Sequence, residues 1–570
     1  MRLIIREYLS LLKESDELDR LLPDLLLAMG IEPISRAQVG VRQYGVDVAA
    51  VGKDKNGKKT LFLFTIKQGD IGRADWDRRN QSVRQSLNEI KDVYLTSSIE
   101  AKYKTLPKKI ILCTGGDLKQ EAETNWKGYV KSHQKKGKIE YDFWGNDRLS
   151  LLIEKHLFNE HILPNELRSK FRKLLALLSD PDYDLSDYYM ILEELLIKAD
   201  YGNTKKLSVK KKIKRALRTI NLCQSIIYFW AKNENNIKSA IYCSERTVLN
   251  AWEFMRKNEL YSNREVSLIY LDLYRTLFRI YTEYFRKVQG HCYVRNGFSG
   301  YGRHYIQECL NTFEHLGLIS TAGLLYLYQA SFEQNKNLVE TLIENSKAIL
   351  DAIKSYIRNH HATGAPCFDS HIIEISEAIY LLSIFSEKDL IDNWVKEVID
   401  QIVFSYDKME KYFPIQSDSF DDLVALCISD RITKDEMFEM STLLPILAQW
   451  CIVLDLSETY LLIHEVVSKF FPKCTLQIWY PDDETDQYIY TCNAAYKSGA
   501  VDAPIKLDVS LDEMKKRINE VQSNTIKPVA LSCIKHGLEV LPILASRHYR
   551  TPLLPFYWQK YVLNKVSKAA

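Results

Sequence analysis

The sequence predicts an α/β N-terminal domain, a mixed sheet flanked by helices, followed by a large all-α region of helical-repeat type. Residues 1–160 alternate between short apolar runs and amphipathic stretches, as expected when strands and helices follow one another. From about residue 165, strand patterns fade and long amphipathic stretches succeed each other. The chain has 570 residues, 46% of them hydrophobic, which suffices for several domains with sizeable cores.

The first elements of the N-terminal domain are placed by hydrophobic spacing and by turn residues. Leucines at helical spacing predict a helix over 16–29, and Gly30 directly after them is a typical helix end. A short strand is expected over 35–41. Two longer apolar strands are expected over 45–52 and 60–67, each of which carries one conspicuous charge.

The turn between these two strands contains Asn56-Gly57, a strong hairpin signal because both residues tolerate positive φ. The two strands are therefore expected to be antiparallel neighbours. The rest of the domain is predicted to consist of a helix over 76–95, a strand over 109–116 that ends in a glycine turn, a helix over 117–135, a strand over 139–144 and a helix over 148–157.

Helical patterns dominate the remainder, which we divide at residue 475. Residues 161–475 are predicted to be all-α and solenoid-like, although no clean repeat period is present. Residues 476–570 are predicted to be mostly helical, with a small β-hairpin formed by 476–480 and 487–491 around an acidic turn. The clearest helical stretches cover 186–199, 266–287, 337–357, 370–384 and 389–405.

Composition narrows the class of protein. The formal net charge is only +3, so a nucleic-acid site has to come from local clustering of charge. No run of about 18 apolar residues is present, and charges interrupt the first apolar residues, so neither a membrane span nor a signal peptide is expected. The 11 cysteines are scattered without a Cys-x-x-Cys pair, which argues against zinc and favours a reducing, cytoplasmic location.

The strand pair carries the clearest chemical signal. Asp47 opens the first strand and Lys67 closes the second, and both strands are otherwise apolar. An acid and a lysine on neighbouring strand ends suit a metal-dependent phosphodiesterase, because the acid binds a divalent cation and the lysine positions water and offsets phosphate charge. An aspartate at a strand edge and a lysine at a strand end are also common as turn and solvated residues.

These residues, with the order of the elements, resemble the PD-(D/E)xK nuclease fold. The resemblance rests on Gly45-x-Asp47, on Thr65-x-Lys67 in the next strand and on the α-β-β-β-α-β order, and it covers about residues 1–160. Mrr-type restriction endonucleases and related bacterial defence nucleases are the most similar in pattern. The resemblance implies a restriction-endonuclease-like sheet and phosphodiester hydrolysis with Mg²⁺ or Mn²⁺.

The resemblance also assigns roles to this chain's residues. Asp47 would be the main metal ligand and Lys67 the catalytic lysine. The position two before the lysine usually holds Glu, Asp or Gln, whereas Thr65 stands here, and a hydroxyl is a weaker ligand than a carboxylate for a hard cation. Asp70, in the following turn, is an alternative source of a carboxylate.

Two further slots of the family fall on helices. The glutamate that family members often add from the first helix would be Glu17, a second metal ligand, with Glu7 or Glu14 as alternatives. The glutamine that often follows the lysine strand would be Gln81 or Gln85, which are spaced i and i+4. Glutamine pairs on helices are also common as plain surface residues.

Basic residues suggest where nucleic acid would bind. The expected nucleic-acid-binding residues are arginines that follow the lysine strand: Arg73, Arg78, Arg79 and Arg84. A basic run over 205–218 is better explained as the solvated face of a helix. No ATP-binding motif is evident, so an energy-dependent step would require a partner protein, such as an NTPase.

The sequence thus leads to two main hypotheses. The first is a metal-dependent endonuclease effector of a bacterial anti-phage or restriction system that cleaves nucleic acid, DNA rather than RNA, with a helical region for sensing, homo-oligomerisation or partner binding. The alternative is a catalytically degenerate nuclease-like module that binds nucleic acid or protein. A purely helical adaptor with an incidental α/β cap is a third reading. Metal-dependent cleavage discriminates between the first two.

Overall fold

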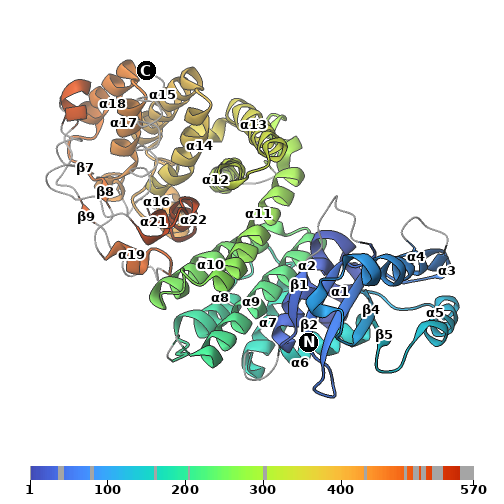
Figure 1. Cartoon of the computed structure of the whole chain (residues 1–570). Helices are drawn as coiled ribbons and strands as arrows, with labels where there is room; N and C mark the ends of the chain where they lie inside the picture. The colour runs from blue at the N-terminus through green and yellow to red at the C-terminus, as the bar shows by residue number, and fades with distance from the viewer. Residues whose placement is uncertain are drawn as a thin grey trace. The chain divides into compact units, whose positions relative to one another are not determined.

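The protein divides into two compact units (Figure 1). The structure, a computed structural model, describes residues 2–35, 44–77, 82–158, 163–202, 204, 206–299, 304–428, 433–480, 484–491, 500–501, 507, 509–516 and 531–551. The N-terminal unit comprises Met1–Ser239 with Asn263–Ile269, and the C-terminal unit comprises Ala240–Ser262 with Tyr270–Ala570. In this described part, no helix combines the length and apolar composition needed to cross a membrane.

A five-stranded mixed sheet organises the N-terminal unit, as the sequence predicts. Its strands are β1 (Glu32–Ser35), β2 (Val48–Lys53), β3 (Lys59–Lys67), β4 (Lys108–Thr114) and β5 (Ile139–Trp144), and they lie in that order. The first three strands pair antiparallel, and β3, β4 and β5 pair parallel. The predicted strand over 35–41 has only its first residue in β1, and residues 36–41 lie outside the described part.

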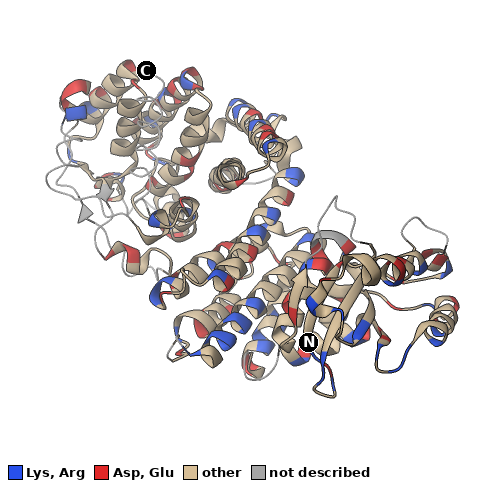
Figure 2. Cartoon of the chain, in the orientation of Figure 1, with Lys and Arg blue, Asp and Glu red and all other residues tan. Residues whose placement is uncertain are grey.

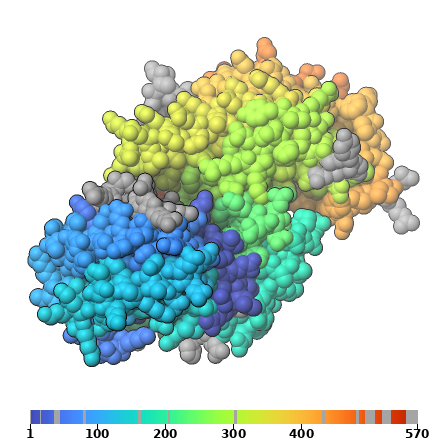
Figure 3. Space-filling model, turned by 90° about the vertical axis from the view of Figure 1, so that its right-hand side faces the viewer, coloured from blue at the N-terminus to red at the C-terminus, as the bar shows by residue number. Residues whose placement is uncertain are grey.

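Helices α3 (Arg73–Asp77), α4 (Val83–Glu89) and α5 (Gln120–His133) cover one face of the sheet. On this face Leu63 and Leu112 pack with Trp76 and Trp126. Figure 3 shows the outer surface of these helices in light blue to cyan. The predicted helix over 76–95 is confirmed over 83–95, which α4 and the π-helical segment η2 (Ile90–Ser98) cover, but it is not continuous, because the non-helical backbone of Ser82 precedes α4.

Helices α1 (Arg2–Leu11), α2 (Asp19–Met29) and α6 (Asn146–His156) lie against the other face (Figure 1). Asn146 joins α6 to α1 and to the end of β4, because its amide nitrogen donates to the carbonyls of Arg6, at 2.8 Å, and Gly115, at 2.7 Å. Sequence patterns did not identify α1. They placed the start of the next helix at 16, where the structure has a π-helical turn, η1 (Glu14–Leu18), before α2.

Helices make up most of the rest of the chain, and the five stretches predicted most clearly coincide with helical segments. The later helices of the N-terminal unit are α7 (Asn165–Leu177), α8 (Ser186–Leu192) with η4 (Glu193–Ile197), and α9 (Leu207–Asn233). They are followed by α10 (Ile237–Lys257), α11 (Arg264–Cys292), α12 (Tyr305–Phe332), α13 (Lys336–Asn359), α14 (Ile372–Ile384), α15 (Lys388–Phe404), α16 (Phe420–Ile428), α17 (Leu443–Val453), α18 (Ser457–Phe470), α19 (Thr485–Tyr488), α21 (Ser532–Lys535) and α22 (Val540–Tyr549). Short 3₁₀ and π turns are η3 (Ala101–Tyr103), η5 (His361–Gly364), η6 (Asp369–His371), η7 (Ser405–Met409) and η8 (Glu436–Phe438).

The predicted hairpin between 476–480 and 487–491 is wrong. β7 (Thr475–Leu476) pairs with β6 (Met440–Ser441), and β8 (Trp479–Tyr480) pairs with β9 (Ala500–Val501). The second predicted strand begins inside helix α19. Its helical turn is stabilised by a hydrogen bond from the Tyr490 hydroxyl to the Asp486 carboxylate, 2.8 Å long and four residues apart, and such spacing suits a helix rather than a strand.

Candidate functional site

Asp47 is fixed against the end of strand β3 by two hydrogen bonds. Its backbone N–H donates to the carbonyl of Phe64 at 2.9 Å, and its side-chain Oδ2 accepts from the N–H of Ile66 at 2.6 Å. The two bonds flank Thr65, so the carboxylate lies at the point where β2 begins to pair with β3. With one bond at its backbone N–H and one at its carboxylate, Asp47 has a defined position without a ligand.

The glycine of the Gly45-x-Asp47 pattern has a structural reason. Gly45 has a φ of +77°, in the left-handed region that favours glycine. A Cβ atom at this position would also collide with the backbone carbonyl of Ser86 in α4. Only glycine therefore allows the chain to pass beneath α4 and deliver Asp47 to the sheet.

Lys67 ends β3 and faces the N-terminal helices. Its Nζ lies 3.9 Å from Oε1 of Glu14, which begins the π-helical turn η1. The Lys67 side chain is 15% exposed and the Glu14 side chain 35% exposed, so the pair lies at a partly open edge. The structure thus gathers Asp47, Lys67 and Glu14 at one end of the sheet; we name these three residues the acid–lysine cluster.

Burial and charge repulsion raise the pKa values of the two carboxyl groups in the acid–lysine cluster. Burial raises the pKa of Asp47 to about 6, against the lowering effects of the Ile66 N–H and of Lys67. Burial also raises the pKa of Glu14, and Lys67 opposes this shift. Asp19, the first residue of α2, raises both pKa values by charge repulsion. A cation placed near these carboxylates would relieve this repulsion.

Thr65 occupies the position where the nuclease pattern usually has a carboxylate. Its side chain is fully buried in β3. Within the described residues, its hydroxyl oxygen has no hydrogen-bond partner, which is costly for a buried polar atom. As a neutral oxygen on the strand to which Asp47 is hydrogen-bonded, the hydroxyl cannot supply a second negative charge.

The other predicted catalytic residues lie elsewhere or outside the described part. Glu17 accepts a hydrogen bond from the backbone N–H of Lys13 at 2.7 Å, so it caps its own helical turn. Gln85 lies on the exposed side of α4, where its amide donates to Glu89 at 3.3 Å. Gln81 lies outside the described residues. Asp70 accepts from the N–H of Asp117 at 3.0 Å and so joins two loops.

Of the four predicted nucleic-acid-binding arginines, two lie on the surface of helices and two lie outside the described residues. Arg73 begins α3 and is exposed. Arg84 lies on α4, where it forms a surface ion pair of 3.1 Å with Asp77. Arg78 and Arg79 lie outside the described residues.

The acid–lysine cluster offers oxygen ligands for a hard cation, although with a small donor set. Two carboxylates, Asp47 and Glu14, and the buried hydroxyl of Thr65 are of the type that Mg²⁺ or Mn²⁺ prefers. Across the ranges that the structure describes, no group of three or more His, Cys, Asp or Glu side chains is arranged to hold a metal ion. A cation bound here would therefore complete its shell with water and substrate oxygens, as Mg²⁺ commonly does.

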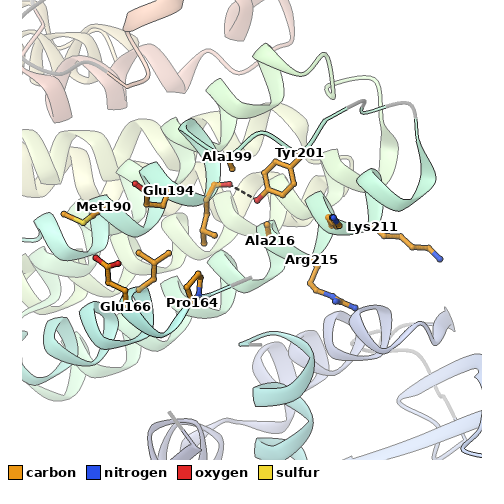
Figure 4. A pocket seen from close by; sticks show the side chains of 12 residues that line it. Pro164, Glu166, Met190, Glu194, Ala199, Tyr201, Lys211, Arg215 and Ala216 are labelled. Carbon is orange, nitrogen blue, oxygen red and sulfur yellow. Dashed lines mark hydrogen bonds between the residues drawn. The ribbon is translucent and has the colours of Figure 1, made fainter. Parts of the chain in front are cut away.

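A separate pocket of about 820 Å³ lies between α7, η4 and α9 (Figure 4). Its lining is mixed: the Tyr201 hydroxyl donates to the carbonyl of Leu195 at 2.8 Å, and Glu166 and Glu194 lie at its rim. Lys211 and Arg215 extend away from it, and Arg215 donates to the carbonyl of Ala28 at 3.1 Å. The cations do not converge on the hollow, and we assign it no function.

Comparisons with known proteins give no relative for this chain. No protein-family model, no curated protein and no solved structure matches it.

Proposed function

We propose that the N-terminal unit is a metal-dependent phosphodiesterase of restriction-endonuclease-like fold that cleaves nucleic acid, with DNA as the favoured substrate. The observation that carries the proposal is the meeting of Asp47, Glu14 and Lys67 at one partly open end of a mixed sheet. A carboxylate pair beside a lysine is suited to hold a divalent cation next to a phosphate.

Each residue of the acid–lysine cluster has a defined task in this proposal. Mg²⁺ or Mn²⁺, when bound, supplies Lewis-acid chemistry and lowers the pKa of a bound water. Asp47 and Glu14 hold that cation through carboxylate oxygens, and the Ile66 N–H keeps Asp47 in place. Lys67 carries the positive charge that offsets charge on the scissile phosphate and orients the attacking water. Thr65 contributes a neutral oxygen at most.

The helical remainder of the chain is assigned to sensing, homo-oligomerisation or partner binding, and the biological setting to bacterial defence against phage. These assignments follow from the resemblance of residues 1–160 to Mrr-type enzymes.

A cleavage assay with a matched pair of lysine variants tests the proposal. Purified protein is incubated with plasmid DNA and with RNA, in Mg²⁺ or Mn²⁺ and in a chelator. Lys67→Ala should abolish metal-dependent cleavage, a loss of at least about 100-fold, because the phosphate loses its nearest charge. Lys127→Ala, which removes an exposed lysine paired with Glu123 on α5, should leave cleavage unchanged. Equal activity of the wild type and Lys67→Ala would refute the assignment.

A degenerate binding module is the second candidate, and Thr65 is the observation that favours it. A buried hydroxyl in the usual carboxylate position leaves the cation with fewer charged ligands. This candidate predicts binding of nucleic acid with no cleavage in Mg²⁺ or Mn²⁺, also when candidate partner proteins are added.

A further inference from the structure

One end of the N-terminal sheet carries an unusual density of lysines. The segments 53–59, 102–109 and 131–138 each contain four lysines, and none of them contains an arginine. The twelve side chains are Lys53, Lys55, Lys58, Lys59, Lys102, Lys104, Lys108, Lys109, Lys131, Lys135, Lys136 and Lys138. We name this surface the lysine end. The whole chain has a net charge of only +3, whereas these three segments contain twelve lysines and one acid, so the lysine end is a local excess of positive charge.

Strand pairing brings the three segments together in space. Lys53 pairs with Lys59 across the β2–β3 hairpin, and Leu61 of β3 is beside Lys108 of β4. The backbone N–H of Lys108 in turn donates to the carbonyl of Lys138, at 2.9 Å, just before β5. All three segments therefore lie at the same end of the sheet, and their lysines are drawn in blue in Figure 2.

Acidic residues leave most of this charge uncompensated. The only acid within the three segments, Asp54, uses its Oδ1 to accept from the N–H groups of Asn56 and Lys58, at 2.9 and 2.8 Å, and so shapes the turn. Two of the twelve lysines form ion pairs: Lys102 with Glu100 at 2.7 Å and Lys109 with Asp142 at 3.0 Å. The other ten form none with the residues that the structure describes.

Such an arrangement is unfavourable for the free protein. Lys53 and Lys59 are directly opposite each other on neighbouring strands, and like charges in this position destabilise a sheet. Most of the other lysines are exposed in loops a short distance away, so their charges also repel. A polyanion bound across the three loops would remove the repulsion and release its own condensed counterions.

The side chains of the lysine end indicate which kind of polyanion it would bind. Lysine contacts phosphates as a point charge, whereas arginine, whose planar fork suits bidentate contacts to bases, is absent from the three segments. No large apolar side chain is exposed in these three loops, so the surface lacks the groups that insert into a lipid bilayer. A regular phosphate backbone, bound without regard to sequence, fits these features best.

We propose that the lysine end is a sequence-independent binding surface for the phosphate backbone of nucleic acid, separate from the acid–lysine cluster. Lys59 and Lys67 are at opposite ends of β3, whose length corresponds to about 26 Å at the usual rise per strand residue. The surface requires no metal and no cleavage. Binding at the lysine end and hydrolysis at the cluster can therefore be measured separately.

A salt titration of binding tests this inference. The full-length chain is titrated against a fluorescein-labelled 30-base-pair duplex in EDTA, at several salt concentrations, with anisotropy as the readout. The test variant replaces Lys55, Lys58, Lys104 and Lys136 by Gln. The matched control replaces exposed lysines of the second unit by Gln: Lys336, Lys347, Lys473 and Lys535.

The test variant should bind at least about tenfold more weakly at 0.1 M salt, and the slope of log affinity against log salt should flatten by about 3 to 4. The control variant should bind like the wild type, and circular dichroism of both variants should be unchanged. Unchanged binding by the test variant, or equal losses in both variants, would overturn the inference.

Anionic phospholipid vesicles, titrated in parallel, identify a different occupant. Loss of vesicle binding in the test variant, with duplex binding intact, would assign the lysine end to a membrane surface and overturn the inference as well. The cleavage proposal is judged separately, because this assay contains no metal. Lysine-dependent binding without any cleavage in Mg²⁺ would support this inference and refute the nuclease proposal.

Discussion

Each of the two units contains a cluster of acidic and basic side chains. The two clusters differ in how completely their charged groups are buried, paired and hydrogen-bonded. In the N-terminal unit, the acid–lysine cluster is partly exposed, and the one ion pair between its members is 3.9 Å long. In the C-terminal unit, Glu245 is fully buried and is contacted by Arg547, His548 and the hydroxyl of Tyr281. One cluster has room for a ligand, whereas the other is closed by protein groups.

The buried cluster of the C-terminal unit joins helices that are far apart in the sequence. Glu245 lies on α10 and Tyr281 on α11, whereas Arg547 lies on α22 and donates to the Tyr281 hydroxyl at 2.7 Å. A second pair, Glu374 of α14 with Arg550, extends the network. Such a network fixes α22 to the helices around it, which is a structural role.

A raised carboxylate pKa does not by itself mark a functional site. Burial raises the pKa of Asp47 and of Glu374 alike. Glu374, however, is paired with Arg550 inside the protein, while Asp47 has one backbone partner and a half-open neighbourhood. Openness and incomplete hydrogen bonding, rather than the direction of the pKa shift, separate the candidate site from the structural cluster.

The largest effect that this comparison predicts is on stability and belongs to the buried cluster. Arg547→Ala removes the main cation beside Glu245, whose carboxylate would remain buried. His548 does not replace it, because burial, with Arg246 nearby, lowers the pKa of this imidazole also when Arg547 is absent. We expect a loss of about 3–5 kcal/mol in the free energy of unfolding, measured by urea titration.

The matched control is an exposed pair of the N-terminal unit. Arg84→Ala breaks the surface contact with Asp77 and should change the free energy of unfolding by less than about 1 kcal/mol. Similar small losses for Arg547→Ala and Arg84→Ala would contradict the structural role of the buried cluster.

A smaller and pH-dependent effect is expected at Asp47. The native state binds a proton at this carboxyl more tightly than the unfolded chain, because its pKa is raised from 3.8 to about 6. Wild-type stability should therefore be lost as the pH rises from about 4 to about 6, by at most about 3 kcal/mol. Asp47→Asn keeps an oxygen for the Ile66 N–H and has no such loss.

Thermal unfolding in a chelator, at pH 4 and at pH 8, measures this difference. The Asn variant should be the more stable protein at pH 8, and its advantage should shrink at pH 4. In Mg²⁺ the same variant should lose cleavage activity. A variant that is less stable than the wild type at both pH values would instead give Asp47 a structural role like that of Glu245.

The sequence predicted much of the sheet because local signals agreed with the final fold. Asn56-Gly57 marked the hairpin, and the apolar runs of β3 and β4 are buried on both faces, as expected for central strands. The sequence did not predict helix breaks and irregular helical turns. Nothing in the residue pattern of 76–95 signals the interruption at Ser82, because the flanking apolar residues continue at helical spacing.

The candidate site was predicted in part for the same reason. Asp47 and Lys67 are separated by a hairpin, so strand geometry alone brings them close. The choice among the glutamates of the first helices depends on a π-helical turn, whose residues rotate differently from those of an α-helix. The sequence favoured Glu17, and the turn presents Glu14 to Lys67 instead. The lysine end was missed because its three segments meet only through the parallel pairing of β3, β4 and β5.

The smallest expected effect concerns Thr65, and it tests directly whether the N-terminal cluster contains an unsatisfied polar group. Thr65→Val removes a buried hydroxyl that has no hydrogen-bond partner among the described residues, so stability should rise by about 1 kcal/mol. Thr60→Val on the same strand is the control, because the Thr60 hydroxyl donates to the carbonyl of Lys58 at 3.1 Å and its loss should destabilise by about 1 kcal/mol.

The activity of the same variant separates two explanations of the hydroxyl. If Thr65 is a neutral, weak ligand, Thr65→Val should lower metal-dependent cleavage by no more than about tenfold, since the carboxylates of Asp47 and Glu14 keep the charge that holds the cation. Complete loss of cleavage with raised stability would make the hydroxyl an essential ligand. The unpartnered hydroxyl would then lower the stability of the protein but be required for its activity. Lowered stability would mean that the hydroxyl is satisfied in the folded protein and that the N-terminal cluster is closed by protein groups, as the C-terminal one is.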